Sequence, residues 1–172
     1  MTVTVRPAHT SELGAVGDLT VTAYSADGYL LDDDPYLAAL RDAPTRAREA
    51  EVYVAELADA VAGSVSRPLV GTVTFCPEGS PWCELAGQGE GEFRMLAVDP
   101  AARRRGVAAA LVGLCVERSR ELGYTALVMS SLAIQRPAHR LYERLGFRRT
   151  PEQDWSPHEG VELIAFRLDL RG

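Results

Sequence analysis

Apolar and polar residues alternate at the start of the chain and change to a helical spacing soon afterwards. Residues 2–6 alternate and are rich in β-branched side chains, which is typical of a strand. The next apolar positions fall on one face of a helix, and its buried side is expected to consist of Leu13, Val16, Leu19 and Thr20. Thr10 or Ser11 has the side chain to cap this helix.

The middle of the chain predicts a second helix and a pair of strands. Pro35 suits the first turn of that helix. Residues 51–57 and 69–75 have strand patterns, and small residues at 62–64 predict the turn between them. Glycine and proline then interrupt the pattern throughout residues 76–91, which indicates a long loop.

Strands and helices alternate after residue 91. The expected elements are strands at 92–98 and 126–130, helices from about 105 to 122 and at 137–145, and further strands beginning at 147 and 161. The apolar positions of the longer helix are Val107, Leu111, Leu114, Cys115 and Leu122. Because a strand, a helix and another strand in succession imply a parallel crossover, this order predicts an α/β fold with a mixed sheet.

Length and composition fit one domain over residues 1–172, with 47% apolar and 24% charged residues. The net charge of −6 argues against a nucleic-acid partner, because phosphate backbones select basic surfaces. No apolar run reaches the about 20 residues of a membrane span, and the amino terminus lacks a secretory pattern, so no membrane partner is expected. Three cysteines without metal-ligand spacing indicate a cytoplasmic protein without a metal.

One basic cluster, residues 103–105, stands directly before a glycine and the start of the long helix. Helix N-termini attract phosphate, and Gly106 would let the backbone approach a ligand without a Cβ in the way. The residues match neither the GxxxxGK[ST] loop nor the GxGxxG loop of nucleotide-binding proteins. Taken alone, the cluster could equally be a solvated helix start.

Two motifs resemble those of the GNAT superfamily of acyl-CoA N-acyltransferases. The first is the stretch Met95-Leu-Ala-Val-Asp-Pro-Ala-Ala-Arg-Arg-Arg-Gly-Val-Ala, which contains the (Gln/Arg)-x-x-Gly-x-(Gly/Ala) pattern after a strand. The second is Ala138-His-Arg-Leu-Tyr-Glu-Arg-Leu-Gly-Phe, at the expected distance downstream. This resemblance implies a mixed sheet of six or seven strands flanked by about four helices.

The resemblance also implies where acetyl-CoA binds. In that family the strand before the loop splays from its neighbour and offers its backbone to pantetheine, here at Leu96, Ala97 and Val98. The pyrophosphate is expected to bind at Arg103, Arg104, Arg105, Gly106, Val107, Ala108 and Ala109. Gln135 stands where the family often has asparagine, and it too is a candidate cofactor contact.

Transfer to an amine needs a proton donor for the leaving thiolate and a base for the amine. Tyr142 matches the family's tyrosine near the cofactor sulfur, and the alternative is a core tyrosine. Glu92 stands at a strand position where the family often has a carboxylate base, with Glu90 as runner-up. Glu92 would also share a strand face with Arg94, so an ion pair is an open alternative.

The family builds its acceptor pocket from the first helices and the C-terminal strands. The resemblance therefore implies acceptor contacts at Tyr24, Tyr29, Tyr36 and Trp155. Aspartates 32–34 would suit a cationic acceptor, although such a run is more often a solvated turn. The identity of the acceptor is left open.

These inferences predict an N-acetyltransferase that moves acetyl from acetyl-CoA directly to an amine in a ternary complex, as a monomer or homodimer. No cysteine is placed as a nucleophile, which argues against an acyl-enzyme. Two alternatives stay open. One is a non-catalytic acyl-CoA sensor or regulatory domain, and the other is a transferase for longer acyl chains.

Overall fold

The structure is a computed structural model that describes residues 2–30, 32–58 and 67–170. Its strands form one mixed seven-stranded sheet in the order β1-β2-β3-β4-β5-β7-β6. The strands are β1 (Val3–Pro7), β2 (Glu51–Leu57), β3 (Leu69–Cys76), β4 (Glu90–Val98), β5 (Ala126–Leu132), β6 (Arg148–Arg149) and β7 (Leu163–Asp169). The predicted α/β class and the mixed sheet are confirmed. The turn predicted at residues 62–64 lies outside the described residues.

The described residues hold five α-helices, close to the predicted number. They are α1 (Leu13–Ala26), α2 (Tyr36–Arg41), α3 (Ala43–Glu49), α4 (Val107–Glu121) and α5 (Arg136–Arg144), and short 3-10 turns occupy Thr10–Glu12, Pro100–Ala102 and Pro151–Gln153. No helix in this described part of the chain is long and apolar enough to cross a membrane.

The chain forms two compact units, which are described separately. Unit 1 consists of residues 1–75 and 95–114, and unit 2 of residues 76–94 and 115–172. Strand β4 and helix α4 each begin in one unit and end in the other.

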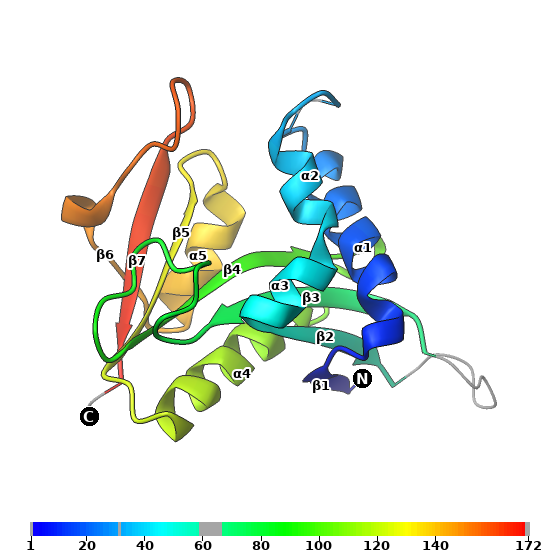
Figure 1. The fold of residues 1–172 in the computed structure, drawn as a ribbon, viewed down its shortest axis with the longest axis horizontal. Helices are drawn as coiled ribbons and strands as arrows, with labels where there is room; N and C mark the ends of the chain where they lie inside the picture. Colours follow the sequence, from blue (N-terminus) through cyan, green and yellow to red (C-terminus); the bar gives the residue numbers. More distant parts are fainter. Residues whose placement is uncertain (1, 31, 59–66, 171–172) are drawn as a thin grey trace. The chain divides into compact units, whose positions relative to one another are not determined.

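Unit 1 has helices on both faces of the strands β1 to β3 (Figure 1). The strands pair antiparallel, β1 with β2 and β2 with β3. On one face the core contains Leu13, Val16, Ala43, Val52 and Val54. On the other face β3 packs against the start of α4, and successive residues of a strand alternate between these two environments.

The segment after Pro35 forms two helices because Asp42 interrupts it. The Asp42 carboxylate accepts a hydrogen bond from the Thr45 amide (3.1 Å) and caps α3. Arg46 of α3 is 1% exposed, and its guanidinium donates to the carbonyls of Ala39 (2.6 Å) and Leu40 (2.8 Å) near the end of α2. One helix therefore satisfies the terminal carbonyls of the other.

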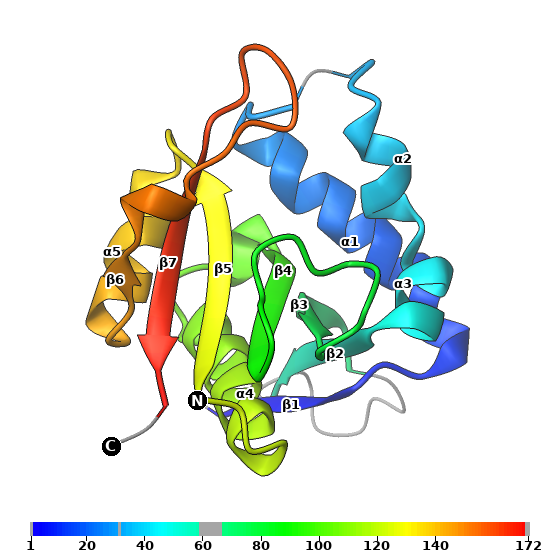
Figure 2. The ribbon, with the colours of Figure 1, turned by 60° about the vertical axis from the view of Figure 1, so that its left-hand side comes forward.

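Unit 2 contains the predicted parallel crossover. Strand β4 pairs with β5 in parallel, and β5 and β6 each pair antiparallel with β7. Helix α5 lies alongside β7 (Figure 2), and its Tyr142 ring packs against Phe93, Phe147 and Phe166 at centroid distances of 5.7–6.1 Å. These aromatic side chains form the core of unit 2.

One local prediction is wrong. The amino-terminal helix is not capped by Thr10 or Ser11; the turn that precedes it is closed by Glu12, whose carboxylate accepts from the His9 amide (2.8 Å). Leu122, the last apolar position assigned to the long helix, directly follows α4 and is 38% exposed.

Candidate active site

The first residues of strand β4 pair with β5 within unit 2. The parallel pairing runs from Glu90↔Ala126 to Glu92↔Val128. Met95 then has φ +52°, a left-handed conformation that is rare for a residue with a Cβ and typical of a bulge. The splay at residues 96–98 that the resemblance implies stays a prediction.

A short turn connects β4 to α4 and presents backbone amides. The Asp99 amide donates to the Val70 carbonyl (2.9 Å), and the Asp99 carboxylate accepts from the Ala101 amide (2.8 Å). Arg104 and Gly106 are left-handed, with φ of +60° and +82°. The Ala110 amide donates to the Gly106 carbonyl (3.0 Å), as expected for the first turn of α4.

The first amides of α4, at Val107, Ala108 and Ala109, precede that first helical bond and have no intrahelical acceptor. They point out of the positive end of the helix, which suits a phosphate. A Cβ added to Gly106 would meet no atom within 4 Å, so the space beside this backbone is open. The predicted phosphate loop therefore has the local geometry of an anion site.

Arg103 has a partner that sequence analysis did not identify. Its guanidinium binds the Asp27 carboxylate through two hydrogen bonds (2.6 and 3.0 Å) and also donates to the Ala23 carbonyl (3.3 Å). Both partners belong to the end of α1. The expected contact of Arg103 with pyrophosphate stays a prediction.

Gly71 of β3 was also missed by sequence analysis. A Cβ at this position would lie 2.6 Å from Val107 Cγ1 and 3.0 Å from Leu111 Cδ1. Only glycine lets the first turn of α4 pack this closely on β3. An isolated glycine inside an apolar strand was the available signal.

Tyr142 is 4% exposed within the aromatic core of unit 2. Burial raises the pKa of its phenol above the usual range, because the phenolate would lose its hydration. The hydroxyl therefore stays protonated at neutral pH and is a weaker acid than an exposed phenol. The packing of Tyr142 agrees equally with the alternative of a core tyrosine.

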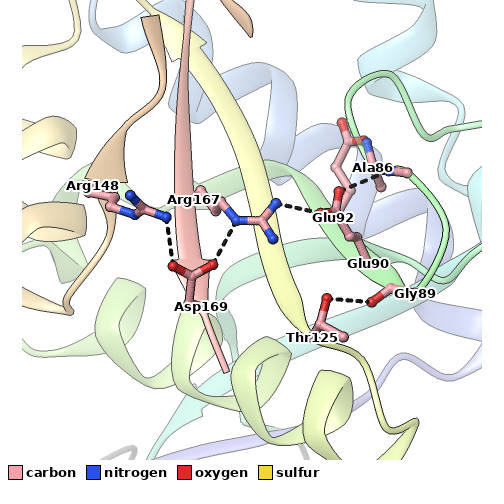
Figure 3. A network of polar contacts seen from close by, with 9 residues as sticks. Ala86, Gly89, Glu90, Glu92, Thr125, Arg148, Arg167 and Asp169 are labelled. Carbon is pink, nitrogen blue, oxygen red and sulfur yellow. Dashed lines mark hydrogen bonds and ion pairs between the residues drawn. The ribbon is translucent and has the colours of Figure 1, made fainter. Parts of the chain in front are cut away.

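Glu92 is fully buried, and its carboxylate holds a loop. Its Oε2 accepts hydrogen bonds from three consecutive backbone amides, those of Glu84 (2.8 Å), Leu85 (2.9 Å) and Ala86 (3.1 Å). Its Oε1 is buried and has no hydrogen-bond partner in the described part of the chain. Figure 3 shows the contact with Ala86. A structural role is therefore visible, and the role of base stays a prediction.

Arg94, on the same strand as Glu92, also binds the loop between β3 and β4. Its guanidinium pairs with Glu84 (2.9 Å), donates to the Trp82 carbonyl (3.1 Å) and lies 5.8 Å from the centroid of the Trp82 ring. Burial raises the pKa of Glu84, and the like charge of Glu92 adds to this, while Arg94 opposes it. Strand β4 thus fixes this loop through both charged side chains.

Glu90, the second candidate for the base, forms an ion pair. Its carboxylate pairs with Arg167, which also binds Asp169 (2.7 Å), and Asp169 in turn binds Arg148 (2.7 Å). Figure 3 shows this chain of contacts across β7. The other Glu90 oxygen accepts from the Gly87 amide (2.9 Å).

Gln135 stands immediately before α5. Its Oε1 accepts from the Ser131 hydroxyl (2.8 Å) and the Leu132 amide (3.1 Å), which closes the turn after β5. This arrangement uses the carbonyl end of the side chain. The predicted contact of the Gln135 amide nitrogen with a cofactor stays a prediction.

The predicted acceptor residues fall in both units. Tyr24 belongs to the last turn of α1, Tyr29 follows that helix and Tyr36 begins α2, and all three are half-buried. The Tyr36 amide donates to the Asp34 carboxylate (2.8 Å). Trp155 belongs to unit 2, where its backbone bridges to Leu163 of β7.

The cysteines are all free thiols. Burial raises the pKa of Cys76 beyond its usual range, and burial together with the charge of Glu92 raises the pKa of Cys83 to about 11. Both are protonated at neutral pH and poor nucleophiles. Among the described residues, no three His, Cys, Asp or Glu side chains lie close enough to hold a metal ion.

Sequence comparison finds the model of the acetyltransferase (GNAT) family over residues 18–147. A curated N-acetyltransferase of Schizosaccharomyces pombe is 31% identical over 101 residues, which cover 59% of this chain and 56% of that protein. Other curated N-acetyltransferases match over 22–35% of their own length. The chain thus spans little more than half of these relatives at most.

Solved structures with the same fold are similar over nearly the whole chain. A GNAT acetyltransferase of Staphylococcus aureus Mu50 has a TM-score of 0.75 at 11% identity, covering 99% of this chain and all of that one. A Salmonella typhimurium protein, solved with its cofactor acetyl-CoA, has a TM-score of 0.65 at 19% identity, covering 99% and 95%. With the family match over most of the sequence, the chain belongs to the GNAT family of acetyltransferases.

Proposed function

We propose that the protein transfers the acetyl group of acetyl-CoA to an amine. The observation that carries this proposal is the turn at residues 103–109, where a left-handed Gly106 precedes the free amides of α4. A diphosphate is the ligand class that such a helix start suits. Membership of the GNAT family supports acetyl-CoA, which contains a pyrophosphate, as this ligand, and the acetyl-CoA complex of the Salmonella protein agrees with this choice.

We further propose direct transfer in a ternary complex. The high thiol pKa values of Cys76 and Cys83 disfavour an acyl-enzyme. Tyr142, which is protonated at neutral pH, is the proposed donor to the leaving thiolate because it matches the family's tyrosine. A backbone amide of Leu96, Ala97 or Val98 would polarise the thioester carbonyl. Glu92 is the proposed base.

The binding half of this proposal is tested by isothermal titration with acetyl-CoA. Gly106→Trp should abolish binding, because a side chain would fill the open space beside the loop in a conformation that disfavours any Cβ. Gly79→Trp is the matched control: Gly79 has φ +83° and open space as well, but lies in the β3–β4 loop. Binding by the native chain and by Gly79→Trp, and not by Gly106→Trp, supports the site.

The catalytic half is tested with a panel of amines, by following release of free thiol from acetyl-CoA. Thiol release that requires an acceptor supports the transferase. A chain that binds acetyl-CoA and releases no thiol with any amine would be a sensor. A native chain that binds no acetyl-CoA would overturn the whole proposal.

A further inference from the structure

The contact between Arg103 and Asp27 joins two segments that are far apart in the sequence of unit 1. Arg103 follows the turn Pro100–Ala102, and Asp27 directly follows the last residue of α1. Both oxygens of the carboxylate are bound, with the guanidinium in a bidentate arrangement. The side chains are 38% and 32% exposed, so water only partly screens the pair.

Asp27 is an unfavourable residue for α1 on its own. It occupies the C-cap, where the helix dipole is negative and a carboxylate is repelled. Arg103 removes this conflict, because it neutralises the carboxylate and also donates to the Ala23 carbonyl in the last turn (3.3 Å). The end of α1 is therefore completed by a residue of the phosphate loop.

The same contact fixes the phosphate loop. Arg103 is extended, with φ −63° and ψ 157°, and the next residue, Arg104, is left-handed. A left-handed arginine is strained and persists only where its surroundings hold it. Anchoring the Arg103 side chain on α1 holds the residue immediately before the strained one.

The contact also decides which groups remain for pyrophosphate. Three of the five guanidinium N–H donors of Arg103 already have acceptors, two on Asp27 and one on Ala23. The amides of α4 and the side chain of Arg104 are then the candidate groups for the phosphates. Arg103 would act by holding the loop rather than by touching the ligand.

We infer that Asp27 is a positioning residue which, through Arg103, couples acetyl-CoA binding in the loop to the order of the acceptor segment that follows α1. The inference rests on the proposed function. The ion pair holds the loop in the conformation that binds the cofactor. It also couples cofactor binding to the order of residues 24–30, where the acceptor is expected to bind.

The test combines isothermal titration with hydrogen exchange of the full chain, with and without saturating acetyl-CoA. Asp27→Asn and Arg103→Gln should each weaken acetyl-CoA binding by about threefold to tenfold, and the double variant no further, because both remove one pair. The reversed pair Asp27→Arg with Arg103→Asp should recover part of the affinity. Glu117→Gln, which breaks the exposed Arg120–Glu117 pair (2.6 Å), is the control and should leave binding unchanged.

Hydrogen exchange provides the readout that a purely structural role would not change. In the native chain acetyl-CoA should slow exchange in residues 107–110 and 24–30. In Asp27→Asn, saturating acetyl-CoA should still slow exchange at 107–110 relative to the ligand-free variant, and should no longer slow it at 24–30. Native-like protection of 24–30, or tighter binding by Asp27→Asn, would overturn the inference while leaving the proposed function intact. A native chain that binds no acetyl-CoA would overturn both.

Discussion

Gly71 of β3 lies so close to Val107 of α4 that a Cβ on the glycine would sit 2.6 Å from Val107 Cγ1. Val107 is 1% exposed and is the first residue of the helix whose amides form the proposed phosphate site. The Ala97 carbonyl would be 3.3 Å from the same Cβ. The absence of one side chain thus allows the helix start to pack against β3 next to the end of β4.

Gly71→Ala should therefore damage both stability and cofactor binding. The added methyl must displace Val107 or the strand, which is expected to lower the free energy of unfolding by about 1–3 kcal/mol. Because displacement of Val107 moves the first turn of α4, acetyl-CoA should bind more weakly as well. Thermal denaturation and isothermal titration measure the two effects.

The control for this change is Gly113→Ala on α4, the helix whose first turn packs against Gly71. A Cβ at Gly113 meets nothing within 4 Å, and alanine is the better helix former by about 1 kcal/mol. This variant should be as stable as the native chain or more stable, with unchanged binding. Equal destabilisation by both alanines would contradict the proposed close packing at Gly71.

Variants of Glu92 separate its structural role, which is to bind the loop amides, from its proposed role as the base. Glu92→Ala leaves three loop amides without their acceptor, and we expect a loss of about 2–4 kcal/mol and faster exchange at residues 84–86. Glu92→Gln keeps an acceptor oxygen and should lose about 1 kcal/mol. If Glu92 is also the base, Glu92→Gln should lower kcat by about 10²-fold or more while the fold persists. Native-like kcat in Glu92→Gln would leave only the structural role.

Much of the fold follows from periodicity, since the strands and helices after residue 91 begin and end close to the expected residues. Gly123 and Gly146 follow the ends of α4 and α5 and are both left-handed, so glycine is a local signal for these ends. The break at Asp42 had a readable signal as well, an aspartate two residues before Pro44 at the start of α3. Helix ends and breaks of this kind depend on neighbouring residues, so the local sequence is enough to predict them.

The site was less accessible to prediction because its contacts are distant in sequence. The ion pair of Arg103 with Asp27 spans 76 positions, and nothing near either residue indicates the other. The left-handed Met95 has no sequence signal either, because methionine seldom adopts this conformation. The loop motif could be recognised, but the contacts that set its shape could not.

Tyr142→Phe tests the proposed proton donor. Phenylalanine keeps the ring among Phe93, Phe147 and Phe166, so the melting temperature should change little. Loss of the hydroxyl should lower kcat by about 10²-fold at pH 7. Because burial raises the pKa of this phenol, the native rate should show no loss from phenol ionisation below about pH 10. Tyr124→Phe, whose hydroxyl accepts from the Glu78 amide (2.9 Å), is the control and should keep its kcat.

Acid should weaken unit 1 through a cluster at its amino terminus. Arg6 donates to both oxygens of Glu12 (2.8 and 2.7 Å) and also binds Glu56. This hydrogen bonding lowers the pKa of Glu12 to about 2. A carboxyl whose pKa is lower in the folded state stabilises the fold above its unfolded pKa, and the contribution disappears as the pH falls through the folded value.

Stability should therefore fall between about pH 5 and pH 2, by about 1–2 kcal/mol from this group once solvent screening of the partly exposed pair is allowed for. Glu12→Gln keeps an acceptor for the His9 amide but loses the charge, so it should be less stable at pH 7 and show a smaller loss on acidification. Glu121→Gln, from the exposed Arg118–Glu121 pair, is the control and should follow the native curve. Denaturant titration from pH 7 to pH 2.5 measures all three, and a native slope in Glu12→Gln would mean that other carboxylates carry the acid response.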